Sequence, residues 1–147
     1  MSKTYTGAGV LFRYPDDWFL AEERGEDDFT ITVGDGETTQ WSVTLMPGRP
    51  QPKEVLKQAV RAFREEYESL DVTESKVRLA GHSANAADLD FECFELLNAA
   101  FLRTFRTDRF TVLVMYQATG HELDALEPVF EDINGSLRCE EADGERD

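Results

Sequence analysis

Residues 100–116 read AFLRTFRTDRFTVLVMY, two apolar runs joined by a short polar stretch. This pattern predicts a β-hairpin, and a tip at Thr107-Asp108 would set the pairs on its two faces. The expected pairs are Phe105 with Phe110, Arg103 with Val112, Phe101 with Val114, Thr104 with Thr111, Leu102 with Leu113, and Ala100 with Met115. Because both faces are mostly apolar, we expect the hairpin to lie centrally in a sheet that is covered on both sides.

The segment after the proline-rich stretch 47–52 is amphipathic and predicts one cover. Pro52 suits the first turn of a helix, and apolar residues recur at helical spacing at Leu56, Val60, Phe63 and Tyr67. We expect a helix over 52–68. Its other side is interpreted as a solvated face of mixed charge, made of Lys53, Glu54, Lys57, Arg61, Arg64, Glu65 and Glu68.

A second apolar stripe near the C-terminus predicts the opposite cover. It consists of Leu123, Leu126, Phe130, Ile133 and Leu137. Because Pro128 lies inside this pattern, we expect a helix over 124–137 that begins near Asp124 or carries a kink at Pro128. Residues 1–138 are expected to form a single domain, and the charged residues 139–147 an acidic, disordered tail.

Alternating apolar and polar residues predict further strands before and between these helices. The segments are 9–15, 18–21, 29–33, 40–45, 72–79 and 87–94. The expected fold class is therefore α/β (α+β), an α/β/α sandwich with two main helices and a central antiparallel sheet of about six to eight strands. A helix-grip fold is the rival, but its helices usually follow the first strand, whereas here four strands precede the first helix.

The composition is that of an acidic globular domain. The 147 residues are 41% hydrophobic, and 30 acids against 15 bases give a net charge of −15. This charge argues against nucleic acid or an anionic membrane as partner. The start of the chain lacks the apolar run of a secretory signal, and no stretch approaches the ~20 apolar residues of a spanning helix. With Met1 as the natural start, we expect a cytoplasmic protein.

The residues that could carry catalytic chemistry have a structural interpretation. Asp88, Asp90 and Glu92 share one side of a strand, where they are interpreted as its solvated face. His82 and His121 lack metal-ligand spacing, and Cys93 lies in an apolar alternation. The remaining candidates are Gly34-Asp35-Gly36, a strand-to-strand turn, Cys139 near the C-terminus, and the core aromatics Trp18 and Trp41. We expect no metal, no cofactor and no enzymatic activity.

Arginines gather at the predicted hairpin tip. The expected register sets Arg106 opposite Arg109, a pairing that costs energy unless a carboxylate or an anion bridges it. Asp108 and nearby glutamates could neutralise the pair; alternatively, Arg106 and Arg109 bind an acidic partner or an anionic ligand. Arg103 shares a face with aromatic residues and must either reach past a helix or meet a buried carboxylate.

The order of elements resembles the PsbP-like family, over about residues 8–138. The residues that carry the resemblance are Phe12, Tyr14, Pro15, Asp17, Trp18, Gly81, the 101–116 hairpin, Phe130, Ile133, Ser136 and Leu137. That family includes the extrinsic photosystem II protein, a Ran-binding nuclear-import factor, and effector-associated chaperones of type VI secretion. The resemblance implies an α/β/α sandwich that binds other proteins rather than catalysing a reaction.

The expected function is accordingly a non-catalytic protein-binding module that acts as an adaptor or chaperone. Its acidic surface would suit a basic protein partner, with association that slows as salt is added. The alternative is a small-ligand carrier or an enzyme, with a pocket between the sheet and the C-terminal helix. The sequence does not set the oligomeric state.

Overall fold

The computed structural model describes residues 2–140, which form ten β-strands and two α-helices. The strands are β1 (Ser2–Gly7), β2 (Val10–Pro15), β3 (Phe19–Arg24), β4 (Phe29–Gly34), β5 (Gln40–Met46), β6 (Leu70–Leu79), β7 (His82–Cys93), β8 (Leu96–Arg106), β9 (Thr111–Thr119) and β10 (Arg138–Cys139). The helices are α1 (Pro52–Glu66) and α2 (Gly120–Ser136). None of the helices described is long and apolar enough to cross a bilayer.

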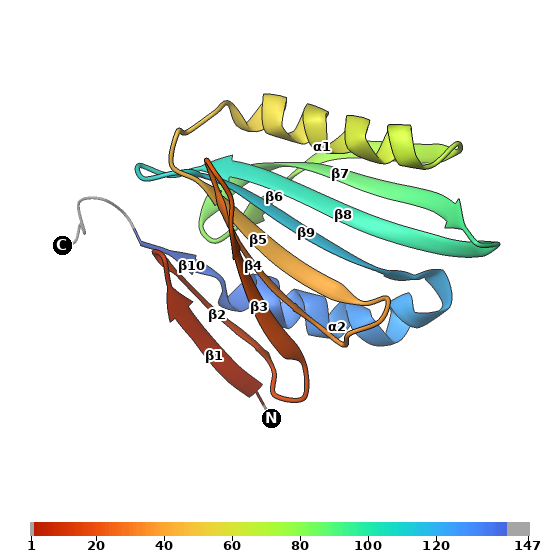
Figure 1. The fold of residues 1–147 in the computed structure, drawn as a ribbon, viewed down its shortest axis with the longest axis horizontal. Helices are drawn as coiled ribbons and strands as arrows, with labels where there is room; N and C mark the ends of the chain where they lie inside the picture. Colours follow the sequence, from red (N-terminus) through yellow and green to blue (C-terminus); the bar gives the residue numbers. More distant parts are fainter. Residues whose placement is uncertain (1, 141–147) are drawn as a thin grey trace.

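The predicted hairpin is central, as expected. Seven antiparallel strands pair in the order β3-β4-β5-β9-β8-β7-β6, and β1-β2-β10 form a second, smaller sheet. Helix α1 covers one face of the large sheet and α2 covers the other (Figure 1). The α/β/α sandwich with a central antiparallel sheet is thereby confirmed.

The register of the hairpin differs from the prediction by two residues. Its tip is Asp108-Arg109, because the Thr107 N–H donates to the Phe110 carbonyl at 2.8 Å. The Thr107 hydroxyl also accepts hydrogen bonds from the N–H groups of Arg109 and Phe110, at 3.1 and 3.2 Å. These bonds hold the tip one residue later than predicted, and each cross-strand partner is therefore shifted by two residues. Because side chains alternate between the two faces of a strand, a shift of two residues leaves each of them on its predicted face. The prediction of a central hairpin therefore does not depend on the exact register.

Two apolar clusters lie on the two sides of the large sheet. The cluster under α1 contains Leu56, Leu89 and Leu102, and the larger cluster under α2 is built around Trp41. The Trp41 ring is fully buried, lies 4.8 Å from the Phe12 ring, and donates its Nε1–H to Asn134 Oδ1 at 2.8 Å. This hydrogen bond attaches α2 to the centre of the sheet.

The helix predictions hold for α1 and partly fail for α2. Helix α1 begins at Pro52, as predicted, and ends at Glu66, two residues before the predicted end, whereas α2 begins at Gly120 rather than near Asp124. The earlier start is stabilised by Glu122, whose carboxylate accepts the hydroxyl of Thr119 at 2.6 Å in the first turn. Pro128 lies within α2 and removes one backbone donor without ending the helix.

The small sheet was not predicted. In β1 only Tyr5 and Gly7 are other than exposed, so the apolar alternation that marks a strand is absent there. At the other end of the chain, β10 pairs with β2, and the Glu140 N–H donates to the Gly9 carbonyl at 2.7 Å. The remainder of the predicted tail, residues 141–147, lies outside the described residues.

Candidate anion-binding groove

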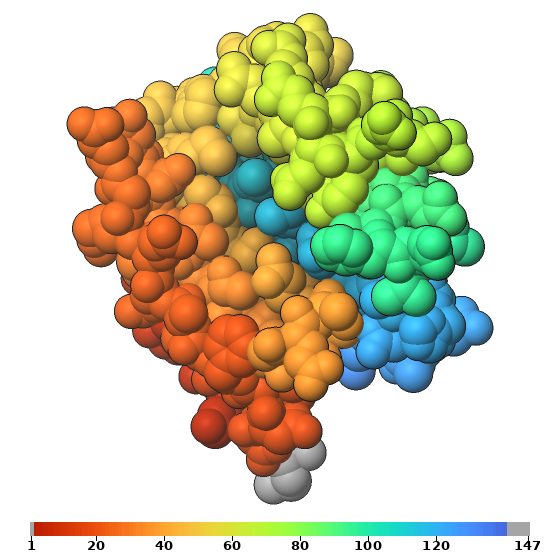
Figure 2. Space-filling view, turned by 45° about the vertical axis from the view of Figure 1, so that its right-hand side comes forward, coloured from red at the N-terminus to blue at the C-terminus, as the bar shows by residue number. Residues whose placement is uncertain are grey.

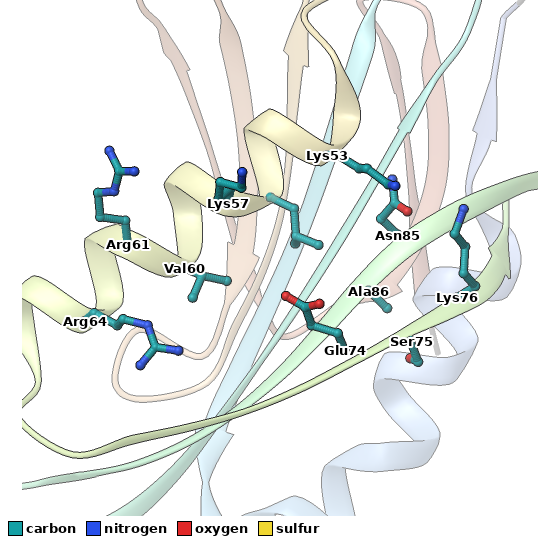
Figure 3. A pocket seen from close by; sticks show the side chains of 11 residues that line it. Lys53, Lys57, Val60, Arg61, Arg64, Glu74, Ser75, Lys76, Asn85 and Ala86 are labelled. Carbon is teal, nitrogen blue, oxygen red and sulfur yellow. The ribbon is translucent and has the colours of Figure 1, made fainter.

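An open groove of about 670 Å³ lies between α1 and the β6–β7 edge of the large sheet (Figure 3). Leu56 and Val60 of α1 line it and supply apolar surface. Asn85 of β7 and Glu74 of β6 extend from the opposite side. Ser75 and Ala86 also line it, together with five cationic side chains: Lys53, Lys57, Arg61, Arg64 and Lys76.

These cations stand out against the charge of the whole chain. They are five of its 15 lysines and arginines, in a protein with a net charge of −15. Within residues 2–140, Lys57 alone among them has a carboxylate within 4.0 Å, that of exposed Glu54 at 3.7 Å. The positive charge of the groove is therefore largely left for a ligand.

The spacing of the cations along α1 is unfavourable for an isolated helix. Lys53, Lys57 and Arg61 follow one another at intervals of four residues, and like charges at this spacing destabilise a helix by roughly 0.2–0.5 kcal/mol per pair. The helix therefore gains no stability from the spacing of these three cations, which is compatible with a role in binding.

The residues predicted to form a solvated face of mixed charge are all exposed, but the prediction did not identify the groove that four of them line. The four α1 cations of the lining already form a row at positions 53, 57, 61 and 64, and that row was the available signal. Lys76 reaches the same groove only because β6 pairs with β7 and forms the edge of the sheet beside α1.

The arginines of the hairpin are separated in the structure. Arg106 faces Thr111 across the hairpin and donates to the Arg49 carbonyl at 3.2 Å, so its predicted opposition to Arg109 is wrong. Arg109 pairs instead with Glu140 at 2.8 Å. Binding of an acidic partner by Arg106 and Arg109 stays a prediction.

We expect the double change Arg106→Ala, Arg109→Ala to alter the free energy of unfolding by no more than ~0.5 kcal/mol, because exposed ion pairs contribute little. The Arg109 and Glu140 side chains are 40% and 70% exposed. Urea denaturation followed by circular dichroism measures the change. A loss well above 1 kcal/mol would show that these contacts hold the β8–β9 turn in place.

Comparison with known proteins bears on the fold. No family model and no curated protein matches the sequence. The cyanobacterial PsbP (CyanoP) of Synechocystis sp. PCC 6803 superimposes with a TM-score of 0.62 at 13% identity, over 94% of this chain and 92% of that one. The chain has the PsbP-like fold. At this identity the likeness shows the fold alone.

Two further solved structures are similar to this chain. LpqN of Mycobacterium tuberculosis matches with a TM-score of 0.53 and 16% identity, over 94% of this chain and 90% of that one. A protein from Bacteroides thetaiotaomicron VPI-5482 matches with a TM-score of 0.61 and 15% identity. The match covers 96% of this chain but 48% of the Bacteroides protein, so this chain spans about half of its length.

The predicted acidic side of β7 is only partly solvated. Asp90 and Glu92 are exposed, whereas Asp88 forms a 2.7 Å ion pair with Arg103. Arg103 thus meets a carboxylate, one of the two outcomes expected for it, but the Asp88 side chain is 43% exposed rather than buried. Within residues 2–140 no group of three or more His, Cys, Asp or Glu side chains is arranged to hold a metal ion.

Of the other candidate residues, His82 and Trp18 take packing positions. His82 stacks on Phe105 with ring centroids 5.0 Å apart, and Trp18 packs edge-on against Phe130 at 6.5 Å. His121 is exposed, and Cys93 is half-buried.

The contact between the sheet and α2, where a ligand pocket was the alternative, is filled by side chains. Phe130 and Ile133 of α2 are buried there, and the Tyr116 ring lies 4.8 Å from that of Phe130. Burial raises the pKa of the Tyr116 hydroxyl, and the nearby Arg103 guanidinium opposes that rise. The groove beside α1 is therefore the stronger candidate site for a ligand.

Proposed function

We propose that this chain is a non-catalytic binding protein that holds an acidic segment of a partner protein in the groove beside α1. The observation that carries the proposal is a row of cations above an apolar floor, of which, within residues 2–140, only Lys57 has a carboxylate within 4.0 Å. Carboxylates of a partner would pair with the cations, while its apolar side chains would cover Leu56 and Val60.

The dimensions of the groove favour an extended chain over a compact ligand. Lys53 and Arg64 are separated by eleven residues of helix, which spans roughly 16 Å at about 1.5 Å per residue. An extended peptide covers that length with about five residues. A small ligand would need an enclosed pocket instead, and the groove is open along its length (Figure 3).

Nucleic acid is a weaker candidate for the same groove. None of the residues that line it is aromatic, so the groove offers no surface on which bases could stack. The net charge of −15 also opposes a long phosphate backbone, which would extend beyond the groove. A short acidic peptide avoids most of this repulsion, because screening over ~8 Å at physiological salt leaves the local charges dominant.

Fluorescence anisotropy with a labelled peptide of alternating Glu and Leu, about ten residues long, tests the proposal. We expect saturable binding that weakens between about 50 and 300 mM NaCl, and weaker binding of the matching Gln–Leu peptide. The double change Lys53→Glu, Arg64→Glu should reduce the affinity at least about tenfold. The helix dipole favours a negative charge near the start of α1 and disfavours one near its end. The effects of the two charge reversals on stability therefore oppose each other, and the fold should tolerate the double change.

The matched control is Lys3→Glu, Arg24→Glu, which changes the net charge equally on β1 and β3, outside the groove. This control should keep most of the affinity. Equal losses in the two double variants would contradict the groove and point to a general charge effect. Equal binding of the Glu–Leu and Gln–Leu peptides would contradict recognition of carboxylates.

A further inference from the structure

The turn between β7 and β8 has a strained backbone. Cys93 pairs with Leu96, so the hairpin closes on two residues, Phe94 and Glu95. Both have positive φ, at 54° and 64°. Tight hairpins of this kind are usually built from Asn-Gly, because a Phe or Glu side chain disfavours this backbone region. The backbone of the turn therefore disfavours both Phe94 and Glu95.

The same turn exposes an apolar surface. Phe94 is 94% exposed, Leu97 68% and Leu96 46%. Figure 1 shows the turn projecting at the right-hand end of the sheet, and in Figure 2 it stands at the surface between the yellow-green start of β6 and the blue start of α2. Strain combined with an exposed aromatic side chain indicates a role in contact rather than in folding.

Acidic side chains surround this apolar tip. Asp90, Glu92 and Glu95 are all exposed, and within residues 2–140 none of the three has a cationic partner. This rim disfavours insertion into an anionic membrane surface. It also disfavours a second copy of the chain, which would bring a further net charge of −15 to the contact. The complementary partner is a protein with an apolar pocket edged by lysine or arginine.

We propose that the β7–β8 turn is a docking element that inserts Phe94 into such a basic-edged apolar pocket of a partner protein. An exposed aromatic ring has few rotatable bonds, and its burial at the centre of a small contact supplies most of the binding energy. The acidic rim would pair with the basic edge and orient the ring. This surface is separate from the groove beside α1, since the lining of the groove includes none of the residues of the turn.

Site-specific photo-crosslinking tests the proposal in cells of the source organism, with p-benzoylphenylalanine in place of Phe94. The matched control places the same residue at Gly48, which is exposed and has nothing within 4 Å of an added Cβ. We expect one protein to crosslink from position 94 and not from position 48. Equal crosslinking from both positions, or a product that is a dimer of this chain or a lipid adduct, would overturn the proposal.

The crosslinked protein is then purified and titrated with variants of the full chain. Phe94→Ala should reduce its affinity at least about thirtyfold. The double change Phe94→Asn, Glu95→Gly should lose the affinity equally while raising Tm by about 3 °C, because it relieves the strained turn. A purified protein that binds Phe94→Ala within about threefold of the unaltered chain would refute an anchor at this position.

The groove variant Lys53→Glu, Arg64→Glu separates the two proposals. It should lose the acidic peptide and keep the crosslinked partner. If it loses the crosslinked partner as strongly as Phe94→Ala does, the contact depends on the groove and the separate docking element is excluded.

Discussion

Trp41→Ala is expected to lower the free energy of unfolding by about 4 kcal/mol, the largest effect of any substitution proposed for this chain. The ring is fully buried between β5 and α2, so its removal leaves a cavity that neighbouring side chains fill only in part. The change also removes the 2.8 Å hydrogen bond from Nε1 to Asn134 and leaves that amide without its partner.

Guanidinium denaturation measures the loss, and Trp18→Ala is the matched control. Trp18 is half-buried and packs edge-on against Phe130, so its truncation should cost clearly less. Hydrogen exchange should also show faster opening of α2 in the Trp41 variant than in the control. Similar losses in both variants would mean that Trp41 is not the residue that holds α2 against the sheet.

Arg103→Ala is expected to cost about 2–3 kcal/mol of folding stability. The Arg103 side chain is 12% exposed. Its guanidinium forms the 2.7 Å ion pair with Asp88 and lies 5.8 and 5.7 Å from the centres of the Phe101 and Tyr116 rings. Its removal strands the Asp88 carboxylate and opens a space between the rings. Because Asp88 is 43% exposed, water partly replaces the lost partner and keeps the cost below that of a fully buried pair.

A double-mutant cycle with Asp88→Ala isolates the ion pair from the packing of the arginine stem. We expect the double variant to be less destabilised than the sum of the two single variants, because no charge is stranded once both partners are gone. Strict additivity would show that Arg103 acts through packing alone. A cost below ~0.5 kcal/mol for Arg103→Ala would place it with the exposed arginines of the hairpin tip.

The ion pair between Arg103 and Asp88 shows which contacts of the large sheet could be predicted from the sequence and which could not. The alternation of the hairpin placed Arg103 on an apolar face and left two outcomes open, a side chain that reaches past a helix or one that meets a buried carboxylate. It could not name Asp88, because the partner lies on β7, and its position relative to β8 depends on the pairing of those strands. The acids of β7 were interpreted as one solvated row, whereas the structure pairs the first and exposes the others.

The sequence alone determined the features that rest on local periodicity. Alternation along 100–116 indicated a hairpin with two apolar faces, and the spacing of Leu56 and Val60 indicated α1. These patterns depend on residues a few positions apart, so the elements that they indicate can be predicted without knowing how the rest of the chain folds. The α/β/α sandwich with a central sheet followed from them.

The tertiary structure decided what depends on residues far apart in the chain. The hydroxyl of Thr107 selects the hairpin tip, and β1 becomes a strand because β2 pairs with it rather than because of its own pattern. The groove forms only when β6 brings Lys76 beside the cations of α1. Charge at a site is a sum over side chains from several elements, and periodicity within one element carries no information about that sum.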